Sequence, residues 1–576
     1  MIKTEGQISL DRISDFPPMP FSFGLIDGNR TGTWKYVQPV YEDKLAPCNE
    51  SCPAGNDIAK WMDFVARGEE DKAYAISRSA HPFAATLGRV CPHPCQDKCN
   101  RAYLGGEIQI HGIERYLGDC AVADGFRPKR PAVKDRKDGK IAVVGSGPAG
   151  LTAAYRLGLM GHNVDVFEAR GQPGGYLRYG IPSYRLPRSV LDAEIALVEQ
   201  AGARIKTGKA LGRELTWSRL ESYDAVLLAI GFHKSSKLNL PGDDLPGVHS
   251  GIDLLGRIAD GRKVKIGRRV AVIGGGNTAM DVARSLLRKG CQVTVYYRRT
   301  RHEMPAISSE VDEAIDEGIP IEFLTAPADI RKRGQGLRLT LQRMKLGQPD
   351  ESGRRRPVPI RGKTFAVNLD AVVTAIGEQA DLNVLPDGVQ KTSWGLSVDL
   401  NLSASRRGLF GAGDAATGMG TVTHAVGDGR RAAEAIARFL SGKLKGEGKA
   451  IPPTWDLIER PHSSAVVRFE NLNTAYFREE LPIAETSLAP TARIKGFREV
   501  VRTFSVAEAR AEANRCFKCG TCNRCENCLV FCPDVSILRR PGDEYPYFEV
   551  DLDHCKGCGV CVTECPRNAL SLKEVS

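Results

Sequence analysis

Ten of the chain's 17 cysteines lie between Cys516 and Cys565, where their spacing is typical of iron–sulfur ligands. The run C-x2-C-x2-C-x3-C-P occurs twice there. In such a pair, the first three cysteines of each run bind one [4Fe–4S] cluster and the fourth binds the other. Zinc fits poorly, because a tetrahedral zinc site needs neither the third cysteine nor the C-P ending. The spacing predicts two clusters, one held by Cys522, Cys525, Cys528 and Cys565 and one by Cys555, Cys558, Cys561 and Cys532.

A glycine-rich turn follows the predicted strand at residues 140–144. It lies in the segment GSGPAG, which precedes a predicted helix and contains Gly145, Gly147, Pro148, Ala149 and Gly150. Glycines allow a tight turn and let backbone N–H groups approach a pyrophosphate at the helix N-terminus. Glu168 ends the next predicted strand, at the position that hydrogen-bonds a ribose hydroxyl. Strand, turn, helix and acidic residue together predict a dinucleotide site.

A second strand-turn-helix unit lies at VIGGGNTAMD. Its turn and helix start contain Gly274, Gly276, Asn277, Thr278 and Ala279. Where the first unit ends its second strand with an acidic residue, this unit ends with Arg298 and Arg299. Arginine at that position favours a 2′-phosphate over a bare hydroxyl, so NADP(H) is predicted in preference to NAD(H). The alternative is that both arginines only face solvent on a basic surface.

A third motif, GLFGAGDAATG, resembles the closing motif of two-dinucleotide flavoproteins. The motif contains Gly413 and Asp414, and the resemblance implies that Asp414 binds the flavin ribityl chain. It also implies that the helix beginning at Thr421 and Val422 directs its N-terminus at the pyrimidine end, where a positive helix end stabilises an anionic reduced flavin. FAD is therefore assigned to the first site, in a domain that an inserted NADP domain divides in sequence.

The stretches GGYLRYGIPSYRLP, which contains Gly175 and Leu177, and YRRTRHEMPA resemble the small subunit of glutamate synthase. The resemblance covers roughly residues 40–445. That family and dihydropyrimidine dehydrogenase share an amino-terminal iron–sulfur domain. The resemblance implies that one [4Fe–4S] cluster is held by Cys52, Cys91, Cys95 and Cys99. The tail, EVDLDHCKGCGVCVTECPRNAL, is similar to the ferredoxin-like delta subunit of 2-oxoacid:ferredoxin oxidoreductases.

The same family has a second amino-terminal cluster, whose C-x2-C pair is missing before Cys48. Cys516 and Cys519, in RCFKCG, look like the missing pair and are surplus to the two crossed clusters. Glu114, in IHGIERY, sits where the family can supply a carboxamide or carboxylate ligand. We hypothesise an additional site made by Cys48, Cys516 and Cys519, with Glu114 as a further candidate. The alternative is that these are spare thiols, so at least three and at most four clusters are expected.

These motifs require a mixed α/β chain of several domains. Strand and helix alternation from Lys140 to about Leu444 predicts two doubly wound, Rossmann-like domains, and the cysteine-rich tail predicts an α+β ferredoxin-like domain. Residues 457–513 give mixed signals and carry no prediction of elements. The expected order is an arm (1–40), a helical [4Fe–4S] domain (41–138), the first segment of the FAD domain (139–264), an NADP domain (265–365), the second segment of the FAD domain (366–445), a linker (446–513) and the ferredoxin-like domain (514–576).

Composition excludes several classes of protein. Hydrophobic residues are 42% and charged residues 26% of the 576, as in ordinary soluble domains, and no apolar run approaches the length of a membrane span. The amino terminus has no apolar signal region, and the clustered cysteines are typical of metal ligands in a reducing compartment, so we expect a cytoplasmic protein. Nucleic-acid binding is not expected, because the basic residues behind the net charge of +11 are dispersed and belong to no recognised module.

These domains together predict an oxidoreductase that needs no catalytic acid, base or nucleophile. Flavins link hydride chemistry to one-electron iron–sulfur chemistry. We expect electron transfer between NADP(H), through FAD and the clusters, and ferredoxin, in either direction, as a subunit serving a 2-oxoacid:ferredoxin oxidoreductase or another ferredoxin-dependent enzyme. The alternatives are a glutamate synthase small subunit, which ordinarily lacks the ferredoxin tail, and a non-catalytic adapter that only conducts electrons.

Overall fold

The computed structural model describes residues 30–129, 139–351, 353–444, 462–542 and 545–575. Most of the expected amino-terminal arm (residues 1–29) and the start of the expected linker (446–461) lie outside these residues. The chain divides into two compact units. In the described residues, unit 1 contains 30–45, 462–476 and 519–575, and unit 2 contains 46–444 and 477–518.

Unit 1 is built from both ends of the chain. Strand β1 (Val37–Tyr41) pairs antiparallel with β21 (Leu570–Glu574), and β2 (Asp43–Leu45) pairs with β18 (His462–Val466). The unit therefore extends beyond the range 514–576 expected from the sequence, because that range lacks the partner of its last strand. Its other elements are η3 (Thr31–Trp34), η9 (Phe469–Asn471), η10 (Thr474–Tyr476), α18 (Asn527–Val530), β19 (Ile537–Arg539), β20 (Phe548–Val550) and α19 (Val560–Thr563).

Unit 2 begins with a helical module whose core surrounds the fully buried Trp61 and Met62. Its elements are α1 (Pro47–Glu50), α2 (Ile58–Ala66), α3 (Glu70–Ala80), α4 (Ala84–Val90), α5 (Pro94–Asp97), η4 (Asn100–Tyr103) and α6 (Ile110–Ala123). Residues 477–518, here called the return segment, add α16 (Pro490–Arg493) and α17 (Val506–Arg515). Phe504 and Ala509 of the return segment belong to the same core, so α17 completes the helical module.

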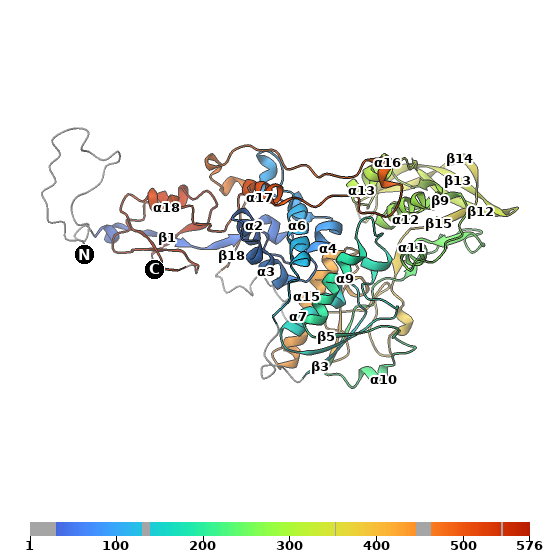
Figure 1. Cartoon of the computed structure of the whole chain (residues 1–576), viewed down its shortest axis with the longest axis horizontal. Coiled ribbons are helices and arrows are strands. Elements are labelled where there is room, and N and C mark those ends of the chain that lie inside the picture. Colours follow the sequence, from blue (N-terminus) through green and yellow to red (C-terminus); the bar gives the residue numbers. More distant parts are fainter. Residues whose placement is uncertain (1–29, 130–138, 352, 445–461, 543–544, 576) are drawn as a thin grey trace. The chain divides into compact units, whose positions relative to one another are not determined.

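The first α/β sheet is parallel, in the order β17-β6-β3-β4-β5. Its central strands are buried on both faces, as their unbroken apolar sequences predict. The elements are β3 (Lys140–Val144), α7 (Pro148–Leu159), β4 (Asn163–Phe167), α8 (Tyr176–Tyr179), α9 (Arg188–Gln200), β5 (Ala203–Lys206), α10 (Trp217–Leu220), β6 (Ala225–Leu228), β17 (Leu409–Gly411), α14 (Asp414–Thr417) and α15 (Val422–Leu440). Helices α7 and α15 lie side by side against this sheet (Figure 1).

Between β6 and β17 the chain forms a second parallel sheet, in the order β11-β10-β9-β15-β8. Its elements are β8 (Val248–Ser250), α11 (Gly251–Ala259), β9 (Arg269–Ile273), α12 (Asn277–Arg288), β10 (Gln292–Tyr296), η6 (Arg301–Glu303), α13 (Ser308–Asp316), β11 (Ile321–Glu322) and β15 (Ala371–Thr374). The sheet extends on both sides of the range 265–365 expected for the NADP domain. Strands β8 and β15 carry no glycine-rich turn, so only their pairing assigns them to this sheet.

A three-stranded antiparallel sheet is inserted before β15. Its strands are β12 (Thr325–Arg333), β13 (Gly336–Pro349) and β14 (Arg355–Leu369), and they are the long yellow strands in Figure 1. A short pair, β7 (Lys234–Ser235) with β16 (Glu378–Gln379), and η7 (Leu382–Val384) complete unit 2. No described helix is both long and apolar enough to cross a membrane.

Candidate functional site

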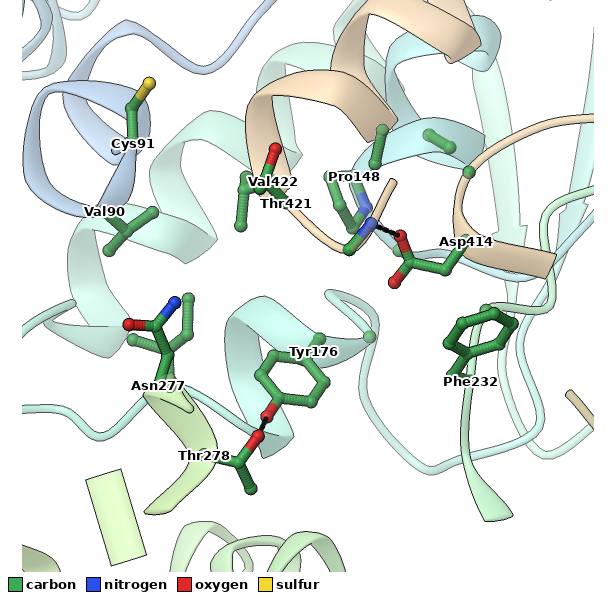
Figure 2. A pocket seen from close by; sticks show the side chains of 18 of the residues that line it. Val90, Cys91, Pro148, Tyr176, Phe232, Asn277, Thr278, Asp414, Thr421 and Val422 are labelled. Carbon is green, nitrogen blue, oxygen red and sulfur yellow. Dashed lines mark hydrogen bonds between the residues drawn. The ribbon is translucent and has the colours of Figure 1, made fainter. Parts of the chain in front are cut away.

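A cavity of about 1590 Å³ lies in unit 2 and is lined by residues from several distant stretches of the sequence. These stretches include the two glycine-rich turns, the closing motif near residue 413, the loop at Cys91 in the helical module, and the return segment. Figure 2 shows Cys91, Pro148, Thr278 and Asp414 around the same space. The fold therefore joins both predicted dinucleotide sites and one predicted cluster cysteine in a single cavity.

The first glycine turn fits a dinucleotide pyrophosphate. Gly145 has φ of +104°, and a Cβ there would lie 2.2 Å from the carbonyl oxygen of Ala229. A Cβ on Gly150 would lie 2.0 Å from the carbonyl oxygen of Gly145. A Cβ on Gly147, by contrast, would meet no atom within 4 Å, because this residue faces the cavity at the start of α7. Two glycines thus close the turn and the third leaves room at a helix N-terminus for an anion.

Glu168 follows β4 and lines the cavity. One of its carboxylate oxygens accepts a hydrogen bond from the Ser146 backbone N–H at 3.1 Å and the other from the Arg170 backbone N–H at 2.7 Å. These contacts fix the carboxylate next to the glycine turn. It is positioned to accept hydrogen bonds from the hydroxyls of a ribose attached to a pyrophosphate in that turn.

The closing motif contributes Asp414 and the N-terminus of α15 to the cavity. The carboxylate of Asp414 accepts a hydrogen bond from the Gly420 backbone N–H at 3.1 Å (Figure 2). Burial and the nearby Asp428 raise the pKa of Asp414 to about 6. Helix α15 begins at Val422, and the hydroxyl of the preceding Thr421 caps it by accepting a hydrogen bond from the His424 N–H at 3.3 Å. A buried carboxyl beside a helix N-terminus suits recognition of a polar ligand that donates hydrogen bonds and carries negative charge elsewhere.

The second glycine turn reaches the same cavity through the first residues of α12. The Thr278 and Tyr176 hydroxyls lie 2.7 Å apart, as Figure 2 shows, and this contact joins the second α/β fold to the first. Asn277 accepts a hydrogen bond from the Ile307 backbone N–H at 2.9 Å. A Cβ on Gly276 would touch nothing closer than 4.0 Å, so the backbone is open to a ligand here as it is at Gly147.

The predicted dinucleotide residues therefore fall into two groups. The cavity is lined by Gly145, Gly147, Pro148, Ala149, Glu168, Gly175, Gly276, Asn277, Thr278, Gly413, Asp414, Thr421 and Val422. The remaining predicted residues, which do not line it, are Gly150, Leu177, Gly274, Ala279, Arg298 and Arg299. Gly150 and Gly274 instead shape their turns, since a Cβ on either would lie about 2.0 Å from a backbone oxygen, and Leu177 and Ala279 are core residues.

The amino-terminal cysteines are divided by their surroundings. Burial raises the pKa values of Cys52, Cys91 and Cys95, and the carboxylate of Glu114 raises all three further. Glu114 is 7% exposed and accepts a hydrogen bond from the Asn56 side chain at 3.0 Å. Three thiols and one carboxylate are thus close enough to act on one another inside the helical module.

Cys99 has different neighbours. Burial raises its pKa, and Arg515 of the return segment opposes that effect. Burial lowers the pKa of Arg101, and the nearby Cys516 and Cys99 oppose this effect. Both cysteines therefore lie near the Arg101 guanidinium. Cys48, Cys99 and Cys516 pack against the same helical core. The return segment therefore brings a cysteine from the predicted RCFKCG pair into the amino-terminal module, whereas Cys519 belongs to unit 1.

Four predicted ligand cysteines share one backbone turn. The residue two positions after the cysteine has a positive φ in each: His93 (55°), Lys518 (55°), Arg524 (62°) and Gly557 (74°). The His93 N–H donates to the Cys91 sulfur at 3.3 Å, and the Lys518 N–H donates to the Cys516 sulfur at the same distance. Left-handed backbone is uncommon outside glycine and marks a local constraint. Cys516 thus has the same backbone geometry as cysteines predicted to bind clusters.

Unit 1 brings its eight predicted cysteines together in two small cavities. One is lined by Cys522, Cys525, Cys528 and Cys565, and the other by Cys532, Cys555, Cys558 and Cys561. This is the crossed grouping that the spacing predicts. Among the described residues, no group of histidine, cysteine, aspartate or glutamate side chains converges on a single metal ion. A [4Fe–4S] cluster does not need convergence, because each cysteine binds a different iron atom.

The amino-terminal strand of unit 1 takes part in both cavities. Tyr41 lines one and Pro39 lines the other. The Tyr41 hydroxyl donates a hydrogen bond to the Cys528 sulfur at 3.1 Å, and the Ala569 N–H donates to the Cys565 sulfur at 3.3 Å. Donors aimed at sulfur are expected around ligand thiolates and tune the reduction potential of a cluster. No sequence signal identifies Tyr41, because it is nearly 500 residues away from the cysteine that it contacts.

The return segment supplies site residues that no sequence motif indicates. Glu485 and Glu499 line the large cavity and contact side chains of the helical module. His111 Nε2 lies 2.7 Å from Glu485, and Glu499 accepts from Arg89 at 2.6 Å and from Arg115 at 2.8 Å. These pairs hold the return segment against the helical module, and residues of both line the cavity. Acidic residues in a stretch without periodicity give no signal from which this placement could be predicted.

A buried ion network holds the two α/β folds together next to the cavity. Its members are Arg185, Asp281, Arg284, Arg288, Glu310, Glu313 and Glu317. Arg185, from the first fold, lies 2.9 Å from Asp281 on α12. Glu317, at the end of α13, accepts hydrogen bonds from both Arg284 and Arg288, and all three side chains are fully buried. Tyr184 covers the network, with the Arg288 guanidinium 3.8 Å from the centre of its ring.

Three protein families match segments of the chain. Residues 139–429, half of the chain, match the family described as pyridine nucleotide-disulphide oxidoreductase. Residues 41–126 match dihydropyrimidine dehydrogenase domain II, 4Fe-4S cluster, and residues 548–571 match a 4Fe-4S binding domain. These ranges contain the cavity-lining dinucleotide residues, the amino-terminal cysteines and the last cysteine run, respectively.

Curated relatives match most of the chain. The NADP(+)-dependent formate dehydrogenase subunit beta of Moorella thermoacetica is 38% identical over 504 residues, which are 82% of this chain and 70% of that one. The NADPH-Fe(3+) oxidoreductase subunit beta of Geobacter sulfurreducens is 35% identical, covering 84% of this chain and 76% of that one. The glutamate synthase [NADPH] small chain of Azospirillum brasilense is 33% identical and covers 69% of this chain and 87% of that one.

Proposed function

Because the chain belongs to the pyridine nucleotide-disulphide oxidoreductase family, and is an NADP-dependent oxidoreductase with FAD-binding and 4Fe-4S domains, we propose that it exchanges electrons between NADP(H) and ferredoxin. The observation that carries this proposal is the cavity of unit 2, where Gly147, Thr278 and Cys91 face one space. Bound FAD would supply the chemistry that such a space needs, since a flavin exchanges hydride with a nicotinamide and single electrons with clusters.

The residues of the first fold hold FAD. The start of α7 at Gly147 presents backbone N–H groups to the pyrophosphate, and Glu168 accepts hydrogen bonds from the adenosine ribose. Asp414 binds the ribityl hydroxyls. The N-terminus of α15 directs its positive end at the pyrimidine ring and favours negative charge there. Tyr176 and Thr278 lie where the nicotinamide of NADP(H) would enter, next to the start of α12.

The second fold binds NADP(H) through Gly276 and the N-terminus of α12. Arg298 follows β10 and contacts the 2′-phosphate. Arg299, which the sequence motif pairs with it, is 5% exposed and is engaged by Asp350 at 2.7 Å. Its role is therefore to hold the local backbone, and the recognition of the phosphate passes to Arg298 and to groups beside it.

The cluster nearest to the cavity is assigned to Cys52, Cys91 and Cys95. For the fourth ligand we propose Glu114 in place of Cys99, because Glu114 acts on all three of these thiols whereas Cys99 lies with Cys516 at Arg101. Comparison of Glu114→Ala with Cys99→Ser by electron paramagnetic resonance tests this assignment. If the signal of this cluster changes in Glu114→Ala but not in Cys99→Ser, the result supports Glu114 as the ligand. If the signal changes in Cys99→Ser but not in Glu114→Ala, the ligand set is the one expected from the sequence.

An additional amino-terminal cluster is supported by the surroundings of Cys48, Cys99 and Cys516. All three pack against one core, and Cys516 shares the left-handed turn of Cys91. Cys519 follows Cys516 in the C-x2-C pair and is kept, on that spacing, as the remaining ligand. Iron analysis of a Cys516→Ser, Cys519→Ser variant is the test. A loss of about four iron atoms per chain is expected, and an unchanged iron content contradicts the additional cluster.

The partners follow from the ferredoxin-like unit and from the relatives. Unit 1 places two four-cysteine cavities on a region of the chain that serves no nucleotide site. The first two relatives are named as beta subunits. We propose that this chain works in the cytoplasm with a catalytic subunit, such as a 2-oxoacid:ferredoxin oxidoreductase or another ferredoxin-dependent enzyme. A glutamate synthase small subunit fits less well, since that relative covers 69% of the chain against 82% and 84% for the beta subunits.

The test is anaerobic reduction of the purified protein. NADPH is expected to bleach the flavin absorbance, to produce cluster signals in electron paramagnetic resonance and to reduce added ferredoxin. NADH at the same concentration serves as the control and is expected to act much more slowly. Bleaching without electrons in clusters or ferredoxin contradicts the proposed route. Failure of both nucleotides, while reduced ferredoxin still bleaches the flavin, favours an adapter that only conducts electrons.

A further inference from the structure

Arg299 is hydrogen-bonded to residues on both sides of the turn between β13 and β14. Arg299 donates to the Asp350 carboxylate at 2.7 Å and to the Arg355 carbonyl oxygen at 2.8 Å. Asp350 in turn accepts from the Arg354 backbone N–H at 3.2 Å, and its own N–H donates to the Arg354 carbonyl at 2.8 Å. The Asp350 carboxylate therefore accepts hydrogen bonds from both the Arg299 guanidinium and the Arg354 backbone, and it links the two residues.

Tyr297 connects that turn to the glycine-rich turn of the second fold. A Cβ on Gly275 would lie 2.5 Å from the Tyr297 ring, so the ring packs directly on the glycines. The Tyr297 hydroxyl donates to the Glu303 carbonyl oxygen at 2.7 Å, which fixes the ring. Burial raises the pKa of Tyr297, and the positive charges of Arg299, Arg354 and Arg298 oppose this rise. Arg354 thus lies near the end of β10, where Arg298 leaves the sheet.

The inserted antiparallel sheet also carries most of the excess charge of the chain. Between residues 325 and 369 there are eleven lysines and arginines and three aspartates and glutamates, a net of +8 within the chain's +11. Strand β14 is exposed along most of its length. Such a concentration of cations next to a nucleotide site attracts a ligand with several phosphates. It provides the long-range attraction but does not by itself select one nucleotide over another.

We propose that Arg354, from the turn between β13 and β14, is a second specificity-determining residue that binds the 2′-phosphate of NADP(H) together with Arg298. The inference rests on the proposed function, in which Arg298 contacts that phosphate. Two guanidinium groups suit a phosphate because each presents a planar fork of donors to its oxygens. NAD(H) carries a hydroxyl at this position and gains nothing from the pair. The inserted sheet, and not the Rossmann-like fold alone, then sets the preference for NADP(H).

The experiment measures binding of two fragments to the full-length holoprotein by titration calorimetry. The first, 2′,5′-ADP, carries the 2′-phosphate, and the second, 5′-AMP, lacks it. Arg354→Gln is compared with Arg298→Gln and with Arg356→Gln, an exposed arginine two residues along the same hairpin. Loss of a charge-assisted contact is expected to weaken 2′,5′-ADP binding by about 10- to 100-fold in the first two variants, with 5′-AMP unchanged. Arg356→Gln is expected to change either by less than about threefold.

The outcomes separate the inference from the function on which it rests. If Arg298→Gln weakens 2′,5′-ADP and Arg354→Gln does not, the inference is overturned and the role of Arg298 stands. If neither variant changes the binding of 2′,5′-ADP, the inference about Arg354 and the proposed role of Arg298 are both overturned. If Arg354→Gln weakens both fragments equally, Arg354 only maintains the turn and the inference is also overturned. Arg354→Lys, which keeps the charge and loses the fork, is expected to fall between the wild type and Arg354→Gln.

Discussion

Replacement of Glu317 by glutamine tests whether the buried ion network stabilises the second α/β fold. The carboxylate accepts four hydrogen bonds from Arg284 and Arg288, at 2.6–3.2 Å, and none of the three side chains is exposed to solvent. Glutamine has nearly the same shape but no charge, so two guanidinium groups stay buried without their shared counter-ion. The remaining partners of Arg284 are Glu310 and Glu313, which are partly exposed.

The expected cost is about 3–5 kcal/mol, which is typical when one member of a buried ion pair is removed. Because this chain has several domains, local opening is a better measure than a single melting temperature. Hydrogen exchange followed by mass spectrometry reports the opening of α12 and α13 separately from the rest. The cost corresponds to a loss of amide protection in these helices of between about 100-fold and a few thousand-fold.

A surface pair provides the matched control. Glu322 contacts Arg343 at 3.0 Å, and both side chains are 44% exposed. The same change, Glu322→Gln, should cost less than about 1 kcal/mol, since exposed pairs contribute little. Equal effects of the two substitutions, or a change at Glu317 below about tenfold in protection, would refute the claim that the network stabilises the fold.

The network also predicts a pH dependence with a definite sign. Burial raises the pKa of Glu317, but the hydrogen bonds and charges of Arg288 and Arg284 lower it more, so the folded value is below that of the unfolded chain. Its contribution to stability is therefore present above the unfolded value of about 4.5 and is lost as the pH falls through the folded value. The difference in protection between the wild type and Glu317→Gln should narrow below that pH.

Three further predictions concern the cofactors. Gly147→Ala should fold normally by circular dichroism and lose FAD, because its Cβ would point into the cavity; full FAD content would contradict the assigned pyrophosphate site. For the crossed clusters, a Cys522→Ser, Cys565→Ser variant should lose about four iron atoms per chain and a Cys522→Ser, Cys532→Ser variant about eight; the reverse order would indicate uncrossed ligation. Tyr41→Phe removes a donor to sulfur and should lower one cluster potential by tens of millivolts, which a redox titration monitored by electron paramagnetic resonance measures; an unchanged potential would exclude that role.

The sequence predicts those features of the site whose residues all lie within a short motif. The turn at Gly145, Gly147 and Gly150 is specified by local sterics, and the structure assigns a separate steric reason to each glycine. The cysteine runs are likewise local, and a fixed spacing determines which thiols can surround one cluster. Asp414 and Thr421 follow from a motif of similar length and both line the cavity.

What the sequence does not predict depends on contacts between distant segments. Arg299 has the residue type and position expected for a phosphate contact, but Asp350, about 50 residues later, engages it. Glu485 and Glu499 reach the cavity from a stretch that has no periodicity. Glu114 lies near cysteines of the helical module, and the packing of α6 against α4 brings it close to Cys91. A single sequence contains no signal for such pairings.

The pairing of β1 with β21 has a consequence for the synthesis of the protein. Val37 lies opposite Glu574, so the first described strand has no partner until almost the whole chain has left the ribosome. At ordinary rates of translation this wait is roughly half a minute to two minutes. Tyr41 and Pro39 form walls of the two four-cysteine cavities, so these cavities are also incomplete during that time. Loading of the clusters proposed for unit 1 is therefore expected only in the finished chain, and a product that stops before β21 would lack a complete unit 1.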